Sequence, residues 1–142
     1  MKYYQIATLV SLCILLGGCA SSATDARADA LANGKAIFST GRDSQGQTIA
    51  AQTPPLMPSC QACHGANGAG GVHLPGGAVS ADLRYSALVS GQKHPYTMAL
   101  LERAISTGID DDGDSLDPVM PRWQLSKQNL HDVAYYVLHK LK

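Results

Sequence analysis

The chain has 142 residues, a formal net charge of zero and an apolar content of 45%. That length suits a single domain with one core, and the balanced charge argues against a clustered basic face of the kind that binds nucleic acid. Phe, Trp and Tyr together make up only 6% of the residues, which is little for a core filled by aromatic side chains. We therefore expect something other than aromatic side chains to fill the centre of the domain.

The amino-terminal segment has the layout of a bacterial export signal. A charged start precedes an apolar run over residues 6–16, as in secretory signals, and the run is shorter than the roughly 20 residues of a membrane helix. The sequence Leu16-Gly17-Gly18-Cys19 then resembles the lipobox of bacterial lipoproteins. That resemblance implies a signal peptide over residues 1–18 and a lipid-anchored Cys19, facing the periplasm or the exterior of the cell envelope. The alternative is an ordinary cleavage around Ala20 to Ala23, which would release a soluble periplasmic protein.

Residues 19–30 contain nothing large enough to anchor a core, and we expect them to form a tether leading into a domain over residues 31–142. Thr24 or Asp25 is expected to cap the first helix, and Gly41 is expected to end it. Four residues fall on one stripe of this helix, namely Leu31, Gly34, Ile37 and Phe38.

Two more helices are predicted, and no strand. Tyr96 to Thr107 follow a proline and precede Gly108, with apolar residues at helical spacing. In the last helix Ser126 supplies the cap, and the residues that repeat at helical spacing are Leu130, Val133, Ala134, Val137, Leu138 and Leu141. Residues 42–58 are predicted to form a loop. The expected fold is all-α, with three to five helices and long loops, and loops of this length indicate that a cofactor organises them.

Cys60-Gln61-Ala62-Cys63-His64 is the attachment motif of c-type haem. On one turn of helix the two sulfurs reach two carbons on one edge of the porphyrin, and the imidazole of His64 can point at the iron as the proximal ligand. A structural zinc site would need a further Cys or His pair. A thioredoxin-like dithiol would follow a strand, but the preceding residues are rich in proline. The motif therefore favours one covalently bound haem c.

The second axial ligand has several candidates. Met57 lies only a few residues before the attachment motif, and Met98 lies on an apolar helical stripe where core packing is the usual role. Met120 lies in a loop before the last helix, far enough along the chain to reach the opposite haem face. His73 is the alternative among the histidines.

Four features together resemble a class I cytochrome c: the attachment motif followed by Gly65, Gly34 with Phe38, Met120-Pro121-Arg122-Trp123, and the last helix with Tyr135-Tyr136. The resemblance covers roughly residues 31–142. It implies that the first and last helices cross beside the haem, with Gly34 and Phe38 against the two tyrosines. It also implies that Met120 is the distal ligand and that a proline carbonyl, here of Pro75, orients the proximal imidazole.

The segment Asp82 to Ser86, taken with Met120-Pro121-Arg122, is similar to the cytochrome domain of quinohaemoprotein alcohol dehydrogenases. This similarity implies that Arg84 contacts a haem propionate, with Trp123 behind it, whereas the alternative for Arg84 is a solvated surface cation. The sequence departs from the family in the aspartates between Asp110 and Asp117. We expect a solvated loop there, since it lacks the glycine and glutamate of a calcium-binding EF-hand.

An iron held by His64 and Met120 has no open position, so the predicted function is electron transfer and not catalysis. The expected partners are redox proteins, namely a dehydrogenase, a terminal reductase or oxidase, or another cytochrome, with the membrane reached through a lipid anchor. The alternative is a haem enzyme or a gas or redox sensor in which Met120 is labile. A third possibility is a tethered subunit of a larger oxidoreductase, with the same electron-transfer role.

Overall fold

The computed structural model describes residues 18–142, with side chains from residue 23 onward. The described elements are α1 (Gly18–Thr40), β1 (Ala50–Ala51), α2 (Cys60–His64), the short turns η1 (Pro75–Gly77) and η2 (Ser86–Ser90), α3 (Met98–Thr107), β2 (Trp123–Gln124) and α4 (Lys127–Lys140). The predicted all-α class is confirmed. Most of the predicted signal peptide, residues 1–17, and the side chain of Cys19 lie outside the described part. Within that part, none of the helices has the length and hydropathy of a membrane span.

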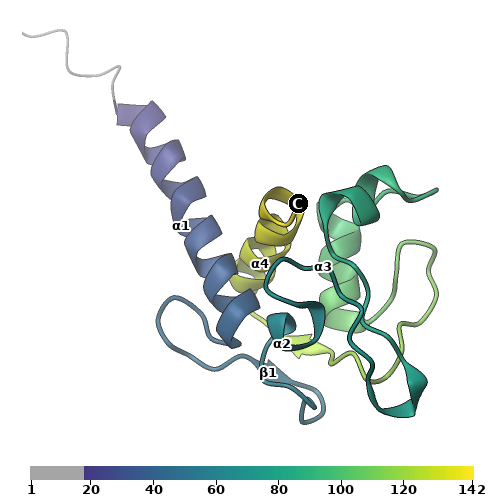
Figure 1. Ribbon diagram of the computed structural model, residues 1–142. Coiled ribbons are helices and arrows are strands. Elements are labelled where there is room, and N and C mark those ends of the chain that lie inside the picture. The colour runs from purple at the N-terminus through teal and green to yellow at the C-terminus, as the bar shows by residue number, and fades with distance from the viewer. Residues whose placement is uncertain (1–17) are drawn as a thin grey trace, which may run out of the picture.

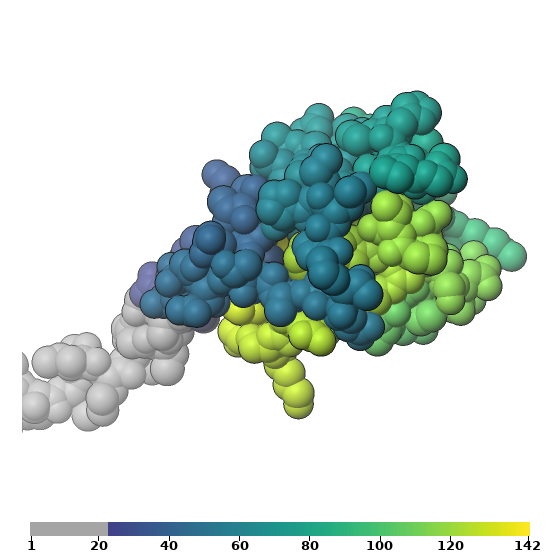
Figure 2. All heavy atoms as spheres, turned by 90° about the horizontal axis from the view of Figure 1, so that it is seen from below, coloured from purple at the N-terminus to yellow at the C-terminus, as the bar shows by residue number. Residues whose placement is uncertain are grey.

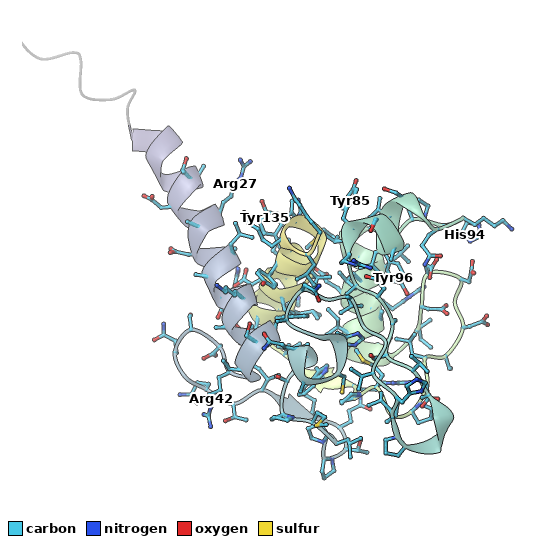
Figure 3. All side chains as sticks on the ribbon, viewed as in Figure 1. Arg27, Arg42, Tyr85, His94, Tyr96 and Tyr135 are labelled. Atoms are coloured by element: carbon cyan, nitrogen blue, oxygen red, sulfur yellow. The ribbon has the colours of Figure 1, made fainter. Side chains whose placement is uncertain are left out.

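The start of α1 differs from the prediction. The helix begins at Gly18 and not at Thr24 or Asp25, so all of the predicted tether, residues 19–30, is helical. Its alanines have the highest helix propensity of any residue, which explains the extension. Residues 23–29 are exposed, and this end of the helix projects from the body of the protein, with Arg27 on the projecting part (Figures 1 and 3).

The predicted end of α1 at Gly41 and the predicted cap of α4 at Ser126 are confirmed. Gly41 has φ 68° and donates its backbone N–H to the carbonyl of Ile37 at 2.9 Å, which ends α1. The Ser126 hydroxyl accepts the backbone N–H of Asn129 at 3.1 Å and caps α4. Helix α3 begins two residues later than Tyr96, because Thr97 is its cap.

Helices α1 and α4 cross in close contact at Gly34. A methyl group on Gly34 would overlap the carbonyl oxygen of Asp132 and lie 2.7 Å from Cβ of Tyr136. One turn further along α1, the ring of Phe38 lies 5.6 Å from that of Tyr136. The expected contact of Gly34 and Phe38 with the tyrosine pair is therefore made through Tyr136, whereas the ring of Tyr135 lies 4.0 Å from that of the exposed His139.

A polar network holds the same crossing in register. The amide nitrogen of Asn33 donates to the buried carboxylate of Asp132 at 2.7 Å and to the side-chain oxygen of Asn129 at 2.9 Å. The side-chain oxygen of Asn33 accepts the backbone N–H of Ser44 at 2.8 Å. The loop after α1 is thereby joined to α4, and the groups at the crossing that would be costly to bury unpaired are satisfied.

The long loops converge on the opposite side of the domain. Strands β1 and β2 pair antiparallel, with Ala50 opposite Gln124 and Ala51 opposite Trp123. The segment that precedes α2 therefore lies against the segment that precedes α4, as the adjoining blue and yellow-green atoms show (Figure 2). No strand was predicted for either segment, and that prediction is wrong here, because a pair of two residues is too short to show alternation in the sequence.

Candidate functional site

A cavity of about 450 Å³ opens between the helices and the long loops. Its wall includes Cys60, Cys63 and His64 of α2. Most of the remaining wall is apolar and comes from every major helix: Phe38, Leu88, Leu101, Ala104, Ile105, Val133 and Val137. The residues that form the core of the domain thus face a space, and an apolar group of matching size would complete the core.

Both cysteines of α2 are free thiols that are partly buried. Burial raises the pKa of Cys60 to about 12 and raises the pKa of Cys63 as well. A redox-active dithiol needs a lowered thiol pKa, so this environment is unlike that of a thioredoxin pair. Among residues 18–142, no group of three or more His, Cys, Asp and Glu side chains could hold a metal ion. The alternatives of a dithiol and a zinc site therefore find no support in the described part.

His64 is buried, and its Nδ1 lies 2.8 Å from the carbonyl oxygen of Ala81. Because a carbonyl only accepts, Nδ1 carries the proton, and the lone pair of the neutral ring is on Nε2. Burial lowers the pKa of His64, an effect that the hydrogen bond to Ala81 opposes. The imidazole is therefore held neutral and in the tautomer that a metal ligand requires.

The partner of His64 corrects the prediction for Pro75. The exposed turn η1 that contains Pro75 is the tip of a small excursion, closed by a bridge between His73 and Val79 and by the backbone hydrogen bond from Leu74 to Ala78 at 2.8 Å. After this turn the chain runs back toward α2, so that Ala81 and not Pro75 lies beside His64. The Ala81 carbonyl reaches Nδ1 in place of a proline carbonyl.

Ser80 holds the segment after η1 against α2. Its buried hydroxyl donates to the carbonyl of Cys63 at 2.7 Å and accepts the backbone N–H of Val72 at 3.0 Å. Gly70 has φ 65°, and a methyl group there would lie 2.5 Å from the carbonyl oxygen of Ser80. The roles of Ser80 and Ala81 were not predicted, because a backbone carbonyl carries no side-chain signal and a lone serine is not distinctive.

Of the candidate distal ligands, Met120 and Met57 line the cavity. Met120 is partly buried and packs against the core, whereas Met57 lies in an exposed stretch and is 38% exposed. Met98 packs against the core without lining the cavity. His73 is exposed and also lies outside the cavity wall. The geometry therefore favours Met120, although Met57 was not expected to reach the same space.

Arg84 and Trp123 differ in their surroundings. Trp123 is 6% exposed and lines the cavity from β2. Arg84 does not line the cavity, and its guanidinium binds the carboxylate of Asp82, with Nε 3.0 Å from Oδ1. This hydrogen bond lowers the pKa of Asp82. The structure thus pairs Arg84 with its own neighbour, and the propionate contact of Arg84 stays a prediction.

The acidic segment lies at the cavity instead of in a loop directed only at solvent. Asp110, Asp111, Asp112 and Asp117 all line the cavity wall. Burial, followed by the nearby charge of Asp111, raises the pKa of Tyr96 to about 12. His94, further out, pairs with Asp112 (Figure 3). The prediction of a solvated loop is therefore incomplete, because part of the loop lines the cavity. The sequence could not show this, because the loop and the attachment motif are far apart in the chain.

A helical domain with two free thiols and a neutral imidazole on one wall of an apolar cavity defines a c-type haem protein. The family model described as Cytochrome c matches residues 31–140, so the chain belongs to the cytochrome c family. Searches of curated proteins and of solved structures found no match. The mostly helical architecture is consistent with the class I cytochrome c fold. The family implies covalently bound haem c and an electron-carrying role, and the cavity with Cys60, Cys63 and His64 fits that group.

Proposed function

We propose that this protein is a mono-haem cytochrome c, tethered to a membrane of the bacterial cell envelope, that transfers single electrons between redox protein partners. The observation that carries the proposal is that Cys60, Cys63, His64 and Met120, from two distant segments, line the same apolar cavity. One attachment motif occurs in the sequence, which supports a single haem.

The residues of the cavity have separable tasks. Cys60 and Cys63 would form the thioethers that make the haem permanent, and His64 would bind the iron through Nε2 while Ala81 holds its Nδ1 proton. Met120 would be the second protein ligand of the iron. When bound, the haem supplies one-electron exchange, and methionine ligation with burial raises its potential. Because two side chains of the protein would bind the iron, no substrate would bind to the iron directly, which supports electron transfer as the function.

The anchor rests on the lipobox at Cys19. Cys19 lies near the start of α1, where residues 23–29 are exposed and the helix projects from the domain (Figure 1). A lipid on Cys19 would therefore be separated from the cavity by a helical stalk. Incorporation of labelled palmitate into wild type and its loss in Cys19→Ser is the expected result. Equal labelling of the two proteins would remove the anchor from the proposal.

The direct test is the optical spectrum of the haem-loaded ferric protein, which should show the weak charge-transfer band of methionine bound to ferric iron near the infrared edge. Met120→Ala should lose the band. Met98→Ala is the matched control, because Met98 does not line the cavity, and it should keep the band. Loss in Met57→Ala instead would move the distal ligand to Met57.

Carbon monoxide separates the electron carrier from a haem enzyme or gas sensor with a labile distal ligand. The reduced wild-type protein should bind carbon monoxide poorly at neutral pH, and Met120→Ala should bind it readily. Ready binding by the wild type would favour the sensor or enzyme. Co-purification of a larger oxidoreductase after mild detergent extraction would identify a fixed subunit, with the same chemistry at the haem.

A further inference from the structure

Arg122 follows the Met120-Pro121 pair, and its guanidinium donates hydrogen bonds to several backbone carbonyls of the segment that carries Met120. Nη2 donates to the carbonyl of Leu116 at 2.7 Å, and Nη1 donates to the carbonyl of Asp117 at 3.2 Å. Nη1 also donates to the carbonyl of Met120 itself. The backbone N–H of Met120 in turn donates to the carbonyl of Asp117 at 3.0 Å. Arg122 thus binds the backbone around the candidate ligand and not its sulfur.

The same guanidinium lies against Gly108, at the end of α3. Gly108 has φ 71°, and a methyl group there would overlap Nε and lie 2.5 Å from Nη2 of Arg122. The carbonyl of Gly108 accepts the backbone N–H of Leu116 at 2.8 Å. This bond and a bridge between Ile109 and Ser115 close the acidic segment into a hairpin. One side chain therefore joins the end of α3, the base of the hairpin and the backbone of Met120.

An arginine suits this task for a physical reason. Its planar fork offers several donors in fixed directions and stays charged at any pH the protein meets, and hydrogen bonds from a charged donor are stronger than neutral ones. Long loops without such ties have many conformations. We propose that Arg122 is a positioning residue that keeps Met120 at the iron. The inference rests on the proposed function, in which Met120 is the distal ligand.

A competing account gives Arg122 only an electrostatic role, in which a positive charge near the haem raises its reduction potential. Arg122→Lys separates the two accounts, because lysine keeps the charge and loses the fork. Arg122→Gln loses both. The matched control is Arg103→Lys, because Arg103 donates to the carbonyl of Asp110 in the same hairpin, away from Met120.

The experiment follows the methionine charge-transfer band of the haem-loaded ferric protein against pH, the carbon monoxide affinity of the reduced protein, and the midpoint potential. As the pH is raised, we expect the band of Arg122→Lys and Arg122→Gln to disappear about one pH unit below the point at which wild type loses it. Carbon monoxide should bind these variants about tenfold more tightly than wild type. Both effects correspond to the loss of one or two hydrogen bonds from a charged donor. Arg103→Lys should behave like wild type. A lysine variant that matches wild type in all three readings would overturn the inference. If only Arg122→Gln changes, and only in potential, the electrostatic account holds instead.

A second pair of variants covers the case in which Arg122 variants fail to load haem. Gly108→Ala pushes the guanidinium aside, whereas Gly113→Ala, in the same hairpin at φ 94°, has no neighbouring atom within 4 Å of the added methyl group. Both carry the strain of a positive φ, but only Gly108→Ala should weaken the band. Equal effects of the two variants would refute the positioning role. Absence of the band from wild type would refute the proposed ligand, whereas a band that is lost in Met120→Ala and kept in every Arg122 and Gly108 variant would refute only this inference.

Discussion

The crossing of α1 and α4 depends on the absence of a side chain at Gly34, and Gly34→Ala tests this dependence. The added methyl group meets the carbonyl oxygen of Asp132 and, at 2.7 Å, Cβ of Tyr136. Neither atom can rotate away, because one belongs to the backbone and the other is bonded directly to it. The helices must therefore separate, which also loosens the contact of Phe38 with Tyr136.

The expected change in the free energy of unfolding of Gly34→Ala is the difference of two opposing effects. Overpacking a close contact costs about 1–3 kcal/mol, and the upper end applies here because the contact is with backbone. Replacing glycine by alanine inside a helix stabilises it by about 1 kcal/mol. We expect a net loss of about 2 kcal/mol in the free energy of unfolding, or a fall in Tm of roughly 6–12 °C for a domain of this size.

The assay is reversible thermal or denaturant unfolding of the haem-loaded protein, followed by circular dichroism. Ala32→Gly, at an exposed position of the same helix, measures the propensity effect alone and should lose about 1 kcal/mol. If Gly34→Ala were as stable as wild type, or more stable, the helices would not be in the close contact described, and the reasoning would be refuted.

Three further predictions concern the surroundings of the cavity. Ser80→Ala leaves the carbonyl of Cys63 without its partner and should lower the free energy of unfolding by about 1–3 kcal/mol; an unchanged denaturation midpoint would contradict this role. The pKa of Tyr96 is raised to about 12, so the folded state holds the phenol proton more tightly than the unfolded chain, and stability should fall as pH rises from about 10 to about 12. Chemical unfolding at several pH values should show this fall in wild type and a smaller one in Tyr96→Phe. Arg84→Ala removes a partly exposed pair with Asp82, so we expect a stability change below about 1 kcal/mol and an unaltered haem spectrum; a large shift of the midpoint potential would instead indicate a propionate contact for Arg84.

The sequence was informative wherever the chemistry is local. The attachment motif places two cysteines and a histidine on one turn, and the structure shows that turn as α2 at the cavity wall. Apolar spacing with caps predicted α3 and α4 to within a few residues. Signals of this kind survive in a single sequence because they depend on neighbours a few positions apart.

Two predictions depended on positions in the family instead of on local chemistry, and in both cases the structure shows a contact that was not predicted. Pro75 was expected to orient His64, and the carbonyl of Ala81 does so. Arg84 was expected at a haem propionate; the structure shows its guanidinium paired with Asp82, and the propionate contact stays a prediction. A backbone carbonyl is the same in every residue, and a guanidinium pairs with whichever carboxylate the fold brings near. Neither choice can be read from residue type.

By itself, the sequence predicted the haem-attachment motif, the helical class and the kind of cofactor that the family implies, because each depends on residue type and short spacing. Only the tertiary structure decided that Ser80 and Ala81 bond to Cys63 and His64, that the acidic hairpin lines the cavity, and that Arg122 binds the backbone around Met120. These contacts join segments that are distant in the chain or involve backbone atoms. They follow from how the loops fold around one apolar space, and no local pattern encodes that path.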